Sequence, residues 1–391
     1  MRQTRVGWRL AALVAVAAIV AAACSSSKSS SSSSTSGTTP PAGGQTVKLG
    51  FFGALTGPNS PQLGINIADG VQLAISQYNA TNPSVKVSYQ PYDSQGDPSI
   101  APSLAQKAIS DGVVALVGPA FSGESKAVDP TFEQAKIVNI TPSATNDTLQ
   151  THGWQYWHRV VANDDFQSPA DIKWITKKLN GKKVGVIDDK SDYGKGIADT
   201  VRKGLTGVAV TNDSIDPKAQ DFSSTVNTMH SAGVDSIFYG GYYADLSRLM
   251  KQLRDGGVTA PIVSDDGSTD PKLLDGNPSE SNVYTTCACL LATSDPNSAS
   301  FVTAYKSMFS ADPGTYSTEG YDSANLVIAA VKAGNTTATT INDYINTHPY
   351  QGLSKTITFD SKHEISGGTI FIYQGTGGKL TSLGQVDKLV P

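Results

Sequence analysis

The strongest constraint on the fold is a regular alternation of strand-like and helix-like segments that begins at Val47. Short β-branched and aromatic runs predict strands, and the stretches between them carry apolar residues at helical spacing. The expected strands of this first series cover 47–55, 85–93, 113–120 and 136–144, and the expected helices cover 65–78, 98–110 and a segment that starts near Ser122. Repeats of strand, helix and strand predict parallel pairing with helices on both faces of the sheet.

A second series of the same kind follows the first. Its expected strands cover 182–189, 208–215, 235–243 and 260–267, and its expected helices cover 167–179, 194–205, 222–232 and 244–254. Two more helices, at 298–309 and 323–333, precede final strands at 355–359 and 368–373. We therefore predict an α/β protein of two Rossmann-like lobes, each with a parallel sheet flanked by helices. Because no helix follows the final strands, we expect the chain to return to a lobe begun earlier.

The N-terminus has the features of an export signal. Arg2, Arg5 and Arg9 precede an uncharged apolar run, 10–23, which is shorter than the roughly 20 residues that a membrane-spanning helix needs. The run ends in three alanines before Cys24, and this resembles a bacterial lipoprotein signal. We expect a signal peptide over 1–23 and lipid on Cys24; the alternative is an ordinary cleavage site beside an incidental cysteine.

The next segment, 24–45, is rich in serine, glycine and proline. Such a composition buries too little surface to fold, so we expect a flexible tether between a membrane anchor and a folded body. The whole chain has a net charge of −4, and its lysines and arginines are scattered. This pattern lacks the basic face that nucleic-acid binding requires.

Sequence motifs for enzymes and nucleotide binding are missing. The chain has no G-x-S-x-G, no H-E-x-x-H and no G-x-G-x-x-G at its first helix. His158 has the residue type of a general base, but a packed histidine is the simpler interpretation. We predict a protein that is not an enzyme and has no cofactor or metal; a hydrolase built from ordinary Ser, Asp and His residues is the alternative.

The loop "GPAFSGES", 118–125, has the glycine spacing of a phosphate-binding P-loop, with Glu124 in place of the lysine. Small residues, hydroxyls and free backbone N–H groups at a helix start favour a small anion. The Glu124 carboxylate is expected to repel a doubly charged phosphate, whereas a carboxylate held by Ser122 is tolerable. Alternatively, Ser122 only caps its helix.

The corresponding loops of the second series carry tyrosines and acids. Tyr193 and Tyr242 offer apolar walls with a polar tip, and Asp265 and Asp266 offer a counter-charge for a cation. One lobe suited to a carboxylate and one suited to an ammonium together predict a zwitterionic ligand, of which a free α-amino acid is the simplest. The alternative for Asp266 is a plain helix cap.

Only Cys287 and Cys289 follow Cys24 in the chain. On an extended segment, residues separated by one position point to the same face, farther apart than a relaxed disulfide prefers. We therefore expect two small buried residues; a strained disulfide is the alternative, and a metal pair lacks nearby ligands.

Seven segments in this order and spacing resemble the branched-chain amino-acid binding proteins of ABC importers, in the type I periplasmic binding protein family: "FFGALTGPNSPQLG", "YDSQGDP", "VGPAFSGES", "ITPSATND", "DKSDYGKG", "FYGGYYAD" and "EGYDSANL". The resemblance covers nearly all of 46–391. It implies a clamp that closes on a ligand and delivers it to an ABC permease with its ATPase. The implied lobes are 46–161 with 292–361 and 162–291 with 362–391, joined by crossovers near 159–162, 287–291 and 361–366.

The resemblance also implies a set of ligand-binding residues. Ser122 and Thr145 would bind the ligand carboxylate with backbone groups of Ala120 and Ser143, and Asp266 would pair with the ammonium. Tyr193 and Tyr242 would close over the ligand from the second lobe. Leu63, Phe121 and Tyr316 would line the pocket for the ligand side chain. Leu63 replaces a frequent aromatic residue and Asp266 a frequent glutamate, so an amide, a urea-like molecule or an aromatic acid is an alternative cargo. A sensory receptor is an alternative role; we expect a lipid-anchored monomer on the outer face of the cytoplasmic membrane.

Overall fold

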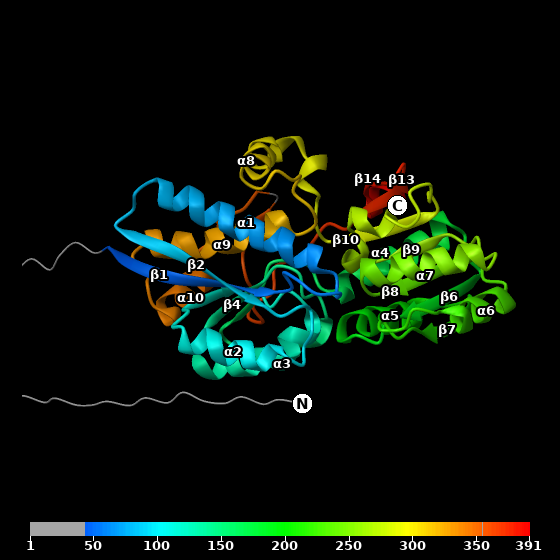
Figure 1. The fold of residues 1–391 in the computed structure, drawn as a ribbon, viewed down its shortest axis with the longest axis horizontal. Helices are drawn as coiled ribbons and strands as arrows, with labels where there is room; N and C mark the ends of the chain where they lie inside the picture. The colour runs from blue at the N-terminus through cyan, green and yellow to red at the C-terminus, as the bar shows by residue number, and fades with distance from the viewer. Residues whose placement is uncertain (1–43, 354) are drawn as a thin grey trace, which may run out of the picture. The chain divides into compact units, whose positions relative to one another are not determined.

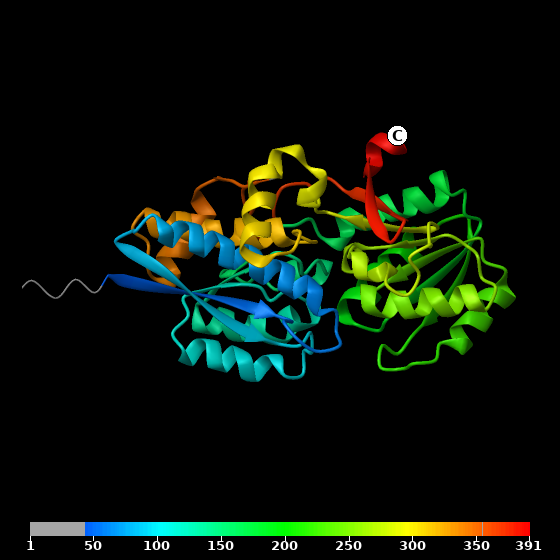
Figure 2. The same cartoon turned by 45° about the horizontal axis from the view of Figure 1, so that its top comes forward.

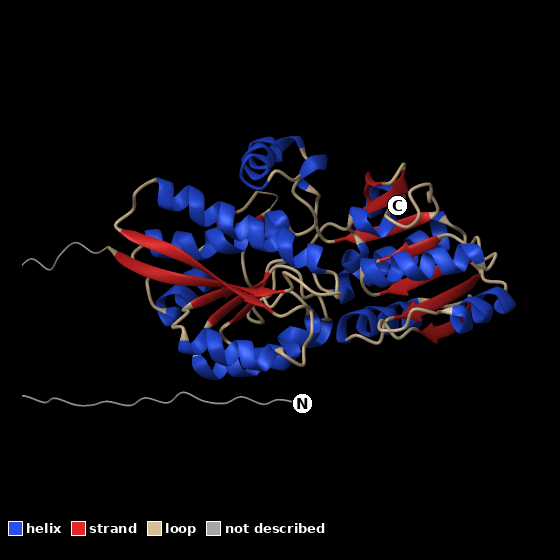
Figure 3. Cartoon of the chain, in the orientation of Figure 1, coloured by secondary structure: helices blue, strands red, loops and turns tan. Residues whose placement is uncertain are grey.

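The computed structural model describes residues 44–353 and 355–391, and residues 44–391 form one compact unit. The expected signal peptide, Cys24 and nearly all of the expected tether lie outside the described residues. Among the described residues, no helix combines the length and apolar character needed to cross a bilayer. The strands form two large sheets and a small hairpin (Figures 1 and 3).

The first sheet has the strand order β2-β1-β3-β4-β5, and all of its strands are parallel. Its strands are β1 (Gln45–Gly53), β2 (Val85–Asp93), β3 (Ala115–Val117), β4 (Val138–Thr141) and β5 (Trp157–Arg159). Neighbouring phenylalanines on β1 point to opposite faces, as the pleat of a strand requires. Phe51 lies in the core with Val71, whereas Phe52 packs edge-on against Phe132, with ring centroids 5.8 Å apart.

Helices cover both faces of this sheet, as Figure 2 shows for its upper and lower sides. One face carries α1 (Pro61–Ala80) and α9 (Ser317–Lys332), which pack against each other, with α10 (Ala338–Thr347) beside them. The other face carries α2 (Ala101–Ser110) and α3 (Ser122–Ala135). The helix α8 (Ala299–Phe309) packs on the outside of α1.

The second sheet has the order β14-β13-β10-β9-β8-β6-β7. Its strands are β6 (Lys183–Asp188), β7 (Ala209–Ser214), β8 (Ser236–Gly240), β9 (Ile262–Ser264), β10 (Val283–Cys287), β13 (Phe371–Thr376) and β14 (Lys379–Gln385). The helices α4 (Asp164–Lys173) and α5 (Asp192–Gly204) pack on one face, and α6 (Ser223–Ala232) and α7 (Tyr243–Asp255) pack on the other. The last helix is the short α11 (Val386–Leu389).

The prediction of two α/β lobes is confirmed, and so is the return of the chain to a lobe begun earlier. The strands β13 and β14 join the second sheet after a long excursion through α8, α9 and α10. They do so in antiparallel register, so the expectation of a wholly parallel second sheet is wrong. A hairpin connects these two strands, and hairpin neighbours must be antiparallel.

The chain passes between the sheets three times: from β5 to α4, from β10 to α8, and from β12 (Thr356–Ile357, paired with β11, Tyr350–Gln351) to β13. A buried ion pair ties the first passage to the third. Arg159 Nε donates to Glu364 Oε2 at 3.0 Å, and the guanidinium also donates to the carbonyls of Ala144 and Asn146 at 2.9 and 2.8 Å. The ion pair thus forms a crossover junction between the first and third passages.

The expectation for the cysteines is wrong in one respect. Cys287 and Cys289 are buried, as predicted, but they form a disulfide with a Cα–Cα distance of 5.0 Å. The strand β10 ends at Cys287 and the chain bends at Ala288 and Cys289. The bend removes the extended geometry on which the argument against a disulfide depended.

Candidate functional site: a cavity between the two sheets

Nine of the ten residues predicted to bind ligand line one small cavity, together with Gly267. Its lining residues are Leu63, Ala120, Phe121, Ser122, Ser143, Tyr193, Tyr242, Asp266, Gly267 and Tyr316. Apart from Tyr316, which lies between α8 and α9, these residues follow the carboxyl ends of strands in both sheets. In each sheet the strand order reverses there, between β1 and β3 and between β6 and β8, and such switch points are where α/β sheets bind ligands.

The first lobe contributes hydroxyl groups and main-chain groups. Ser122 is the first residue of α3, preceded by the extended Phe121, and its side chain makes no capping bond. Instead, its Oγ accepts from the backbone N–H of Asn146 at 3.2 Å, so the capping interpretation is wrong. Ser143 Oγ donates to the carbonyl of Ala120 at 2.7 Å. These bonds join the loops after β3 and β4 into one polar wall.

Thr145 is the predicted residue that does not line the cavity. Its side chain is buried, and its hydroxyl has no hydrogen-bond partner within 44–353 and 355–391. Its backbone carbonyl accepts from Asp164 N at the first crossover, at 3.0 Å. Thr145 is therefore buried beside the first crossover and does not line the cavity.

The second lobe contributes a buried carboxylate, Asp266, which has one phenol partner from each lobe. Tyr193 donates to Asp266 Oδ1 at 2.8 Å, and Tyr316 donates to Asp266 Oδ2. Asp266 begins the 3-10 helix η3 (Asp266–Ser268), and its side chain caps no backbone group there, so the capping interpretation is wrong. Burial raises the pKa of Asp266, and the two tyrosine hydroxyls oppose that rise. An ammonium group placed here would favour the ionised carboxylate.

Contacts between the lobes surround the cavity. Tyr316 belongs to the segment before α9, so its bond to Asp266 joins the two halves. Phe121 and Tyr242 meet edge to face, with centroids 5.3 Å apart, and Asn146 Nδ2 donates to the Asp192 carbonyl at 2.7 Å. The cavity holds only about 10 Å³, space for one water at most. The lobes are thus closed around it, and a larger ligand requires them to open.

A family model for periplasmic binding proteins matches residues 46–379. This chain belongs to the periplasmic binding protein family. The resemblance stated from the sequence is thereby confirmed, and the two-lobed fold of this periplasmic binding protein agrees with it. Because the family is periplasmic, the protein acts outside the cytoplasm.

Two relatives of this periplasmic binding protein are amino-acid-binding proteins. A leucine-, isoleucine-, valine-, threonine- and alanine-binding protein of Pseudomonas aeruginosa is 25% identical over 337 residues, which cover 84% of this chain and 90% of the relative. A branched-chain amino acid transporter substrate-binding protein of Streptococcus pneumoniae, solved with isoleucine, is 27% identical, with a TM-score of 0.79 over 86% of this chain and 100% of that one.

A third relative shares the fold. A solute-binding protein of an ABC transporter from R. palustris, solved with benzoate, has a TM-score of 0.78 at 18% identity, over 87% of this chain and 96% of that one. All three relatives are binding proteins. The absence of enzymatic activity in this chain stays a prediction.

Glu124 does not act as the sequence suggests. Its side chain is fully buried beneath the loop, Ser94 Oγ donates to its Oε1, and burial raises its pKa to about 8. At neutral pH the group is therefore mostly uncharged. The expectation that its charge repels phosphate is wrong, because a protonated carboxyl group carries no charge to repel an anion.

The buried Glu124 predicts a pH dependence of stability. The pKa of Glu124 is about 8 in the folded protein, whereas the ordinary pKa of a glutamate side chain, expected in the unfolded chain, is 4.5. The folded state thus keeps a proton that the unfolded chain releases, so the stabilisation is complete below about pH 4.5 and is lost as the pH rises through 8. We expect the free energy of unfolding, measured in urea, to fall from pH 5 to pH 8. Glu124→Gln should flatten this fall, and an equally steep fall in that variant would contradict the assignment.

Gly267 is the lining residue that was not predicted, although it directly follows Asp266 in the sequence. A Cβ atom at this position would lie 2.6 Å from Tyr193 Cε1 and 2.8 Å from the carbonyl of Gly241. Its backbone N–H also donates to the Tyr193 hydroxyl at 3.0 Å. The signal available in the sequence was a glycine directly after the proposed ammonium-binding aspartate.

We expect Gly267→Ala to displace the Tyr193 ring and to weaken ligand binding by at least about tenfold. The displaced ring would lose its hydrogen bond with the backbone N–H of residue 267, and the loss of one hydrogen bond has an effect of this size. Calorimetric titration measures the effect. The matched control is Gly276→Ala, where the nearest atom to a new Cβ is 3.6 Å away. Equal affinities for Gly267→Ala and the unmodified protein would show that the close contact does not matter.

Proposed function

We propose that this periplasmic binding protein captures a small zwitterion between its closing lobes and delivers it to an ABC permease with its ATPase. An amino acid, with the branched-chain type favoured, is the proposed cargo. The supporting observation is the composition of the cavity: hydroxyls and main-chain groups from one lobe face a buried carboxylate and phenol rings from the other. The relatives from Pseudomonas aeruginosa and Streptococcus pneumoniae bind, by their descriptions, amino acids of this type.

In the proposed complex, Ser122 and the backbone of Ala120 and Ser143 bind the ligand carboxylate. Thr145, whose buried hydroxyl has no partner in the described part of the chain, joins them once the loops shift. Asp266 binds the ammonium in place of the Tyr316 hydroxyl, and the bound state shifts the population toward the closed clamp. Leu63, Phe121, Tyr193, Tyr242 and Tyr316 surround the ligand side chain.

The proposal extends to the organisation of the chain. One lobe comprises 46–161 and 292–361, and the other comprises 162–291 and 362–391. A lipid on Cys24 and a tether over 24–45 hold this monomeric body on the outer face of the cytoplasmic membrane. Labelling with a lipid precursor, with and without Cys24→Ala, tests the anchor.

An aromatic acid is the second candidate cargo. Four aromatic rings line the cavity, those of Phe121, Tyr193, Tyr242 and Tyr316, and such rings suit a flat apolar ligand. An acid without an ammonium group would leave Asp266 with only its tyrosine partners, so the zwitterion is favoured.

A thermal-shift screen tests the proposed function. A ligand that binds only the folded protein raises its melting temperature, by an amount that grows with concentration over Kd. We expect a rise with one or more branched-chain amino acids and, at the same submillimolar concentration, none with the corresponding amines. A rise with benzoates alone would favour the second candidate, and a rise with no amino acid would contradict the first.

A further inference from the structure

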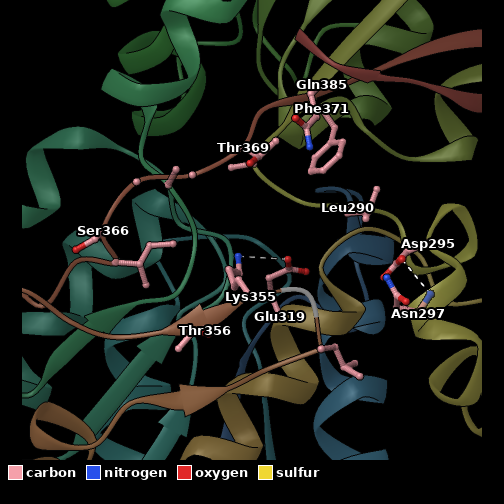
Figure 4. Close-up of a pocket in the computed structure, with 16 residues that line it drawn as sticks. Leu290, Asp295, Asn297, Glu319, Lys355, Thr356, Ser366, Thr369, Phe371 and Gln385 are labelled. Atoms are coloured by element: carbon pink, nitrogen blue, oxygen red, sulfur yellow. Dashed lines mark hydrogen bonds and ion pairs between the residues drawn. The ribbon is translucent and has the colours of Figure 1, made fainter. Parts of the chain in front are cut away.

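A second and larger cavity, of about 460 Å³, lies against the three crossovers (Figure 4). We call it the crossover cavity. Ala162 lines it from the first crossover, Ala288 and Leu290 from the second, and 365–369 from the third. Phe371 and Gln385 line it from the second sheet. It shares no lining residue with the small cavity that holds the proposed cargo.

Glu319, in the first turn of α9, is the buried charge of this cavity. Its side chain is only 1% exposed, yet it lines the cavity and faces Lys355 in Figure 4. One carboxylate oxygen, Oε2, accepts from Thr318 Oγ1 at 2.7 Å. The other, Oε1, has no hydrogen-bond partner in 44–353 and 355–391. A buried carboxylate oxygen without a donor is costly, and a ligand that supplies a donor removes that cost.

Lys355 only partly balances this carboxylate. Its Nζ lies 3.7 Å from Glu319 Oε1, too far for a hydrogen bond, and its side chain is 25% exposed. Asp322, one helical turn beyond Glu319, is also buried, and its carboxylate accepts from the backbone N–H of Leu353. Among the described residues that line the cavity, the carboxylates of Glu319 and Asp295 outnumber the one lysine, Lys355. The balance of charge favours a cationic ligand.

Part of the remaining wall is apolar, although polar groups make up the larger share of the cavity surface. Leu290, Leu353, Ile365 and Phe371 supply hydrocarbon surface around the charged pair. A volume of about 460 Å³ falls in the range of small-molecule sites.

We propose that the crossover cavity binds a small protonated amine with an apolar body. The ammonium group donates to Glu319 Oε1, and the body lies against Leu290 and Phe371. Lys355, whose stem reaches solvent, turns its ammonium group outward to make room. This inference does not depend on the identity of the cargo.

Benzylamine is a suitable probe, with benzyl alcohol as its uncharged counterpart. We expect the purified protein to bind benzylamine with a Kd in the millimolar range, as measured by protein-observed NMR or calorimetry, and to bind benzyl alcohol at least about tenfold more weakly. Glu319→Gln should weaken benzylamine binding at least about tenfold, and Leu290→Trp, which fills the cavity, should abolish it. Leu290→Trp tests the same cavity without changing Glu319, so the result does not depend on whether Glu319→Gln folds correctly.

Asp266→Asn is the matched control, because it removes a carboxylate from the small cavity and leaves the crossover cavity intact. Benzylamine binding that survives Asp266→Asn and is lost in Glu319→Gln and Leu290→Trp supports the proposal. Binding lost in Asp266→Asn and kept in Glu319→Gln would place the amine in the small cavity and overturn the proposal. Binding equal in all variants, or no binding by the unmodified protein, would also overturn it.

Because all three crossovers line the cavity, an occupant should influence lobe closure. This consequence rests on the proposed function. The cavity is formed in the closed arrangement, so an amine that fills it should favour closure and tighten cargo binding, and by reciprocity the cargo should tighten amine binding. A cargo Kd that does not change at saturating benzylamine would contradict this coupling while leaving the amine site itself in place.

Discussion

Asp266→Ala is expected to weaken ligand binding by about 150-fold or more. The substitution leaves a buried ammonium without its carboxylate, and breaking a desolvated pair in this way costs on the order of 3 kcal/mol or more. It also removes the acceptor of the Tyr193 hydroxyl and of the Tyr316 hydroxyl, and the bond from Tyr316 joins the two lobes. Calorimetric titration with the ligand found by thermal shift measures the loss.

The control for this substitution is Asp275→Ala, which removes an exposed aspartate a short distance along the chain. We expect its affinity to equal that of the unmodified protein. If Asp266→Ala also binds every amino acid with unchanged affinity, then the carboxylate does not hold the ammonium, and the zwitterion assignment is wrong.

Glu364→Ala is expected to destabilise the protein by about 3–5 kcal/mol, since it leaves a buried guanidinium without its counter-charge. Arg159 is fully buried, and two of its donors bind Glu364 while a third serves the carbonyls of Ala144 and Asn146. Urea unfolding monitored by fluorescence measures the change in the free energy of unfolding.

An exposed ion pair provides the comparison. Lys251 and Asp255 lie on the surface of α7 with both side chains more than half exposed. Asp255→Ala should change the free energy of unfolding by less than about 0.5 kcal/mol. A loss in Glu364→Ala no larger than this would show that the crossover junction does not depend on the buried pair.

Much of the fold could be predicted from local patterns. The expected strand at 85–93 coincides with β2, and most of the other expected elements overlap observed ones, because apolar periodicity is a local property. The three-residue strand β5 has too few residues to show a period, and α10 and β14 were missed as well. The antiparallel return of β13 was not visible, since strand direction depends on pairing across the sheet.

For the site, too, its residues could be predicted from the sequence, but their contacts and protonation could not. The switch-point rule and the resemblance placed nine of ten predicted residues around one cavity. The partners of Asp266 come from positions 73 and 50 residues away in the chain, so its hydrogen bonds could not be read from neighbouring residues. Glu124 was misjudged because burial, which decides its protonation, is a property of the tertiary structure. Glu319 and Lys355 belong to separate elements, and nothing in the sequence pairs them.

The central claim is that the protein binds both the ammonium and the carboxylate of its ligand. A calorimetric comparison of three molecules tests it most directly. One is the amino acid that gives the largest thermal shift, and the others are its two analogues that lack either the ammonium or the carboxylate. We predict that the amino acid binds and that each analogue binds at least about 100-fold more weakly, because each leaves a buried polar group of the cleft unpaired. An analogue with a single charge that binds as tightly as the amino acid would contradict the account.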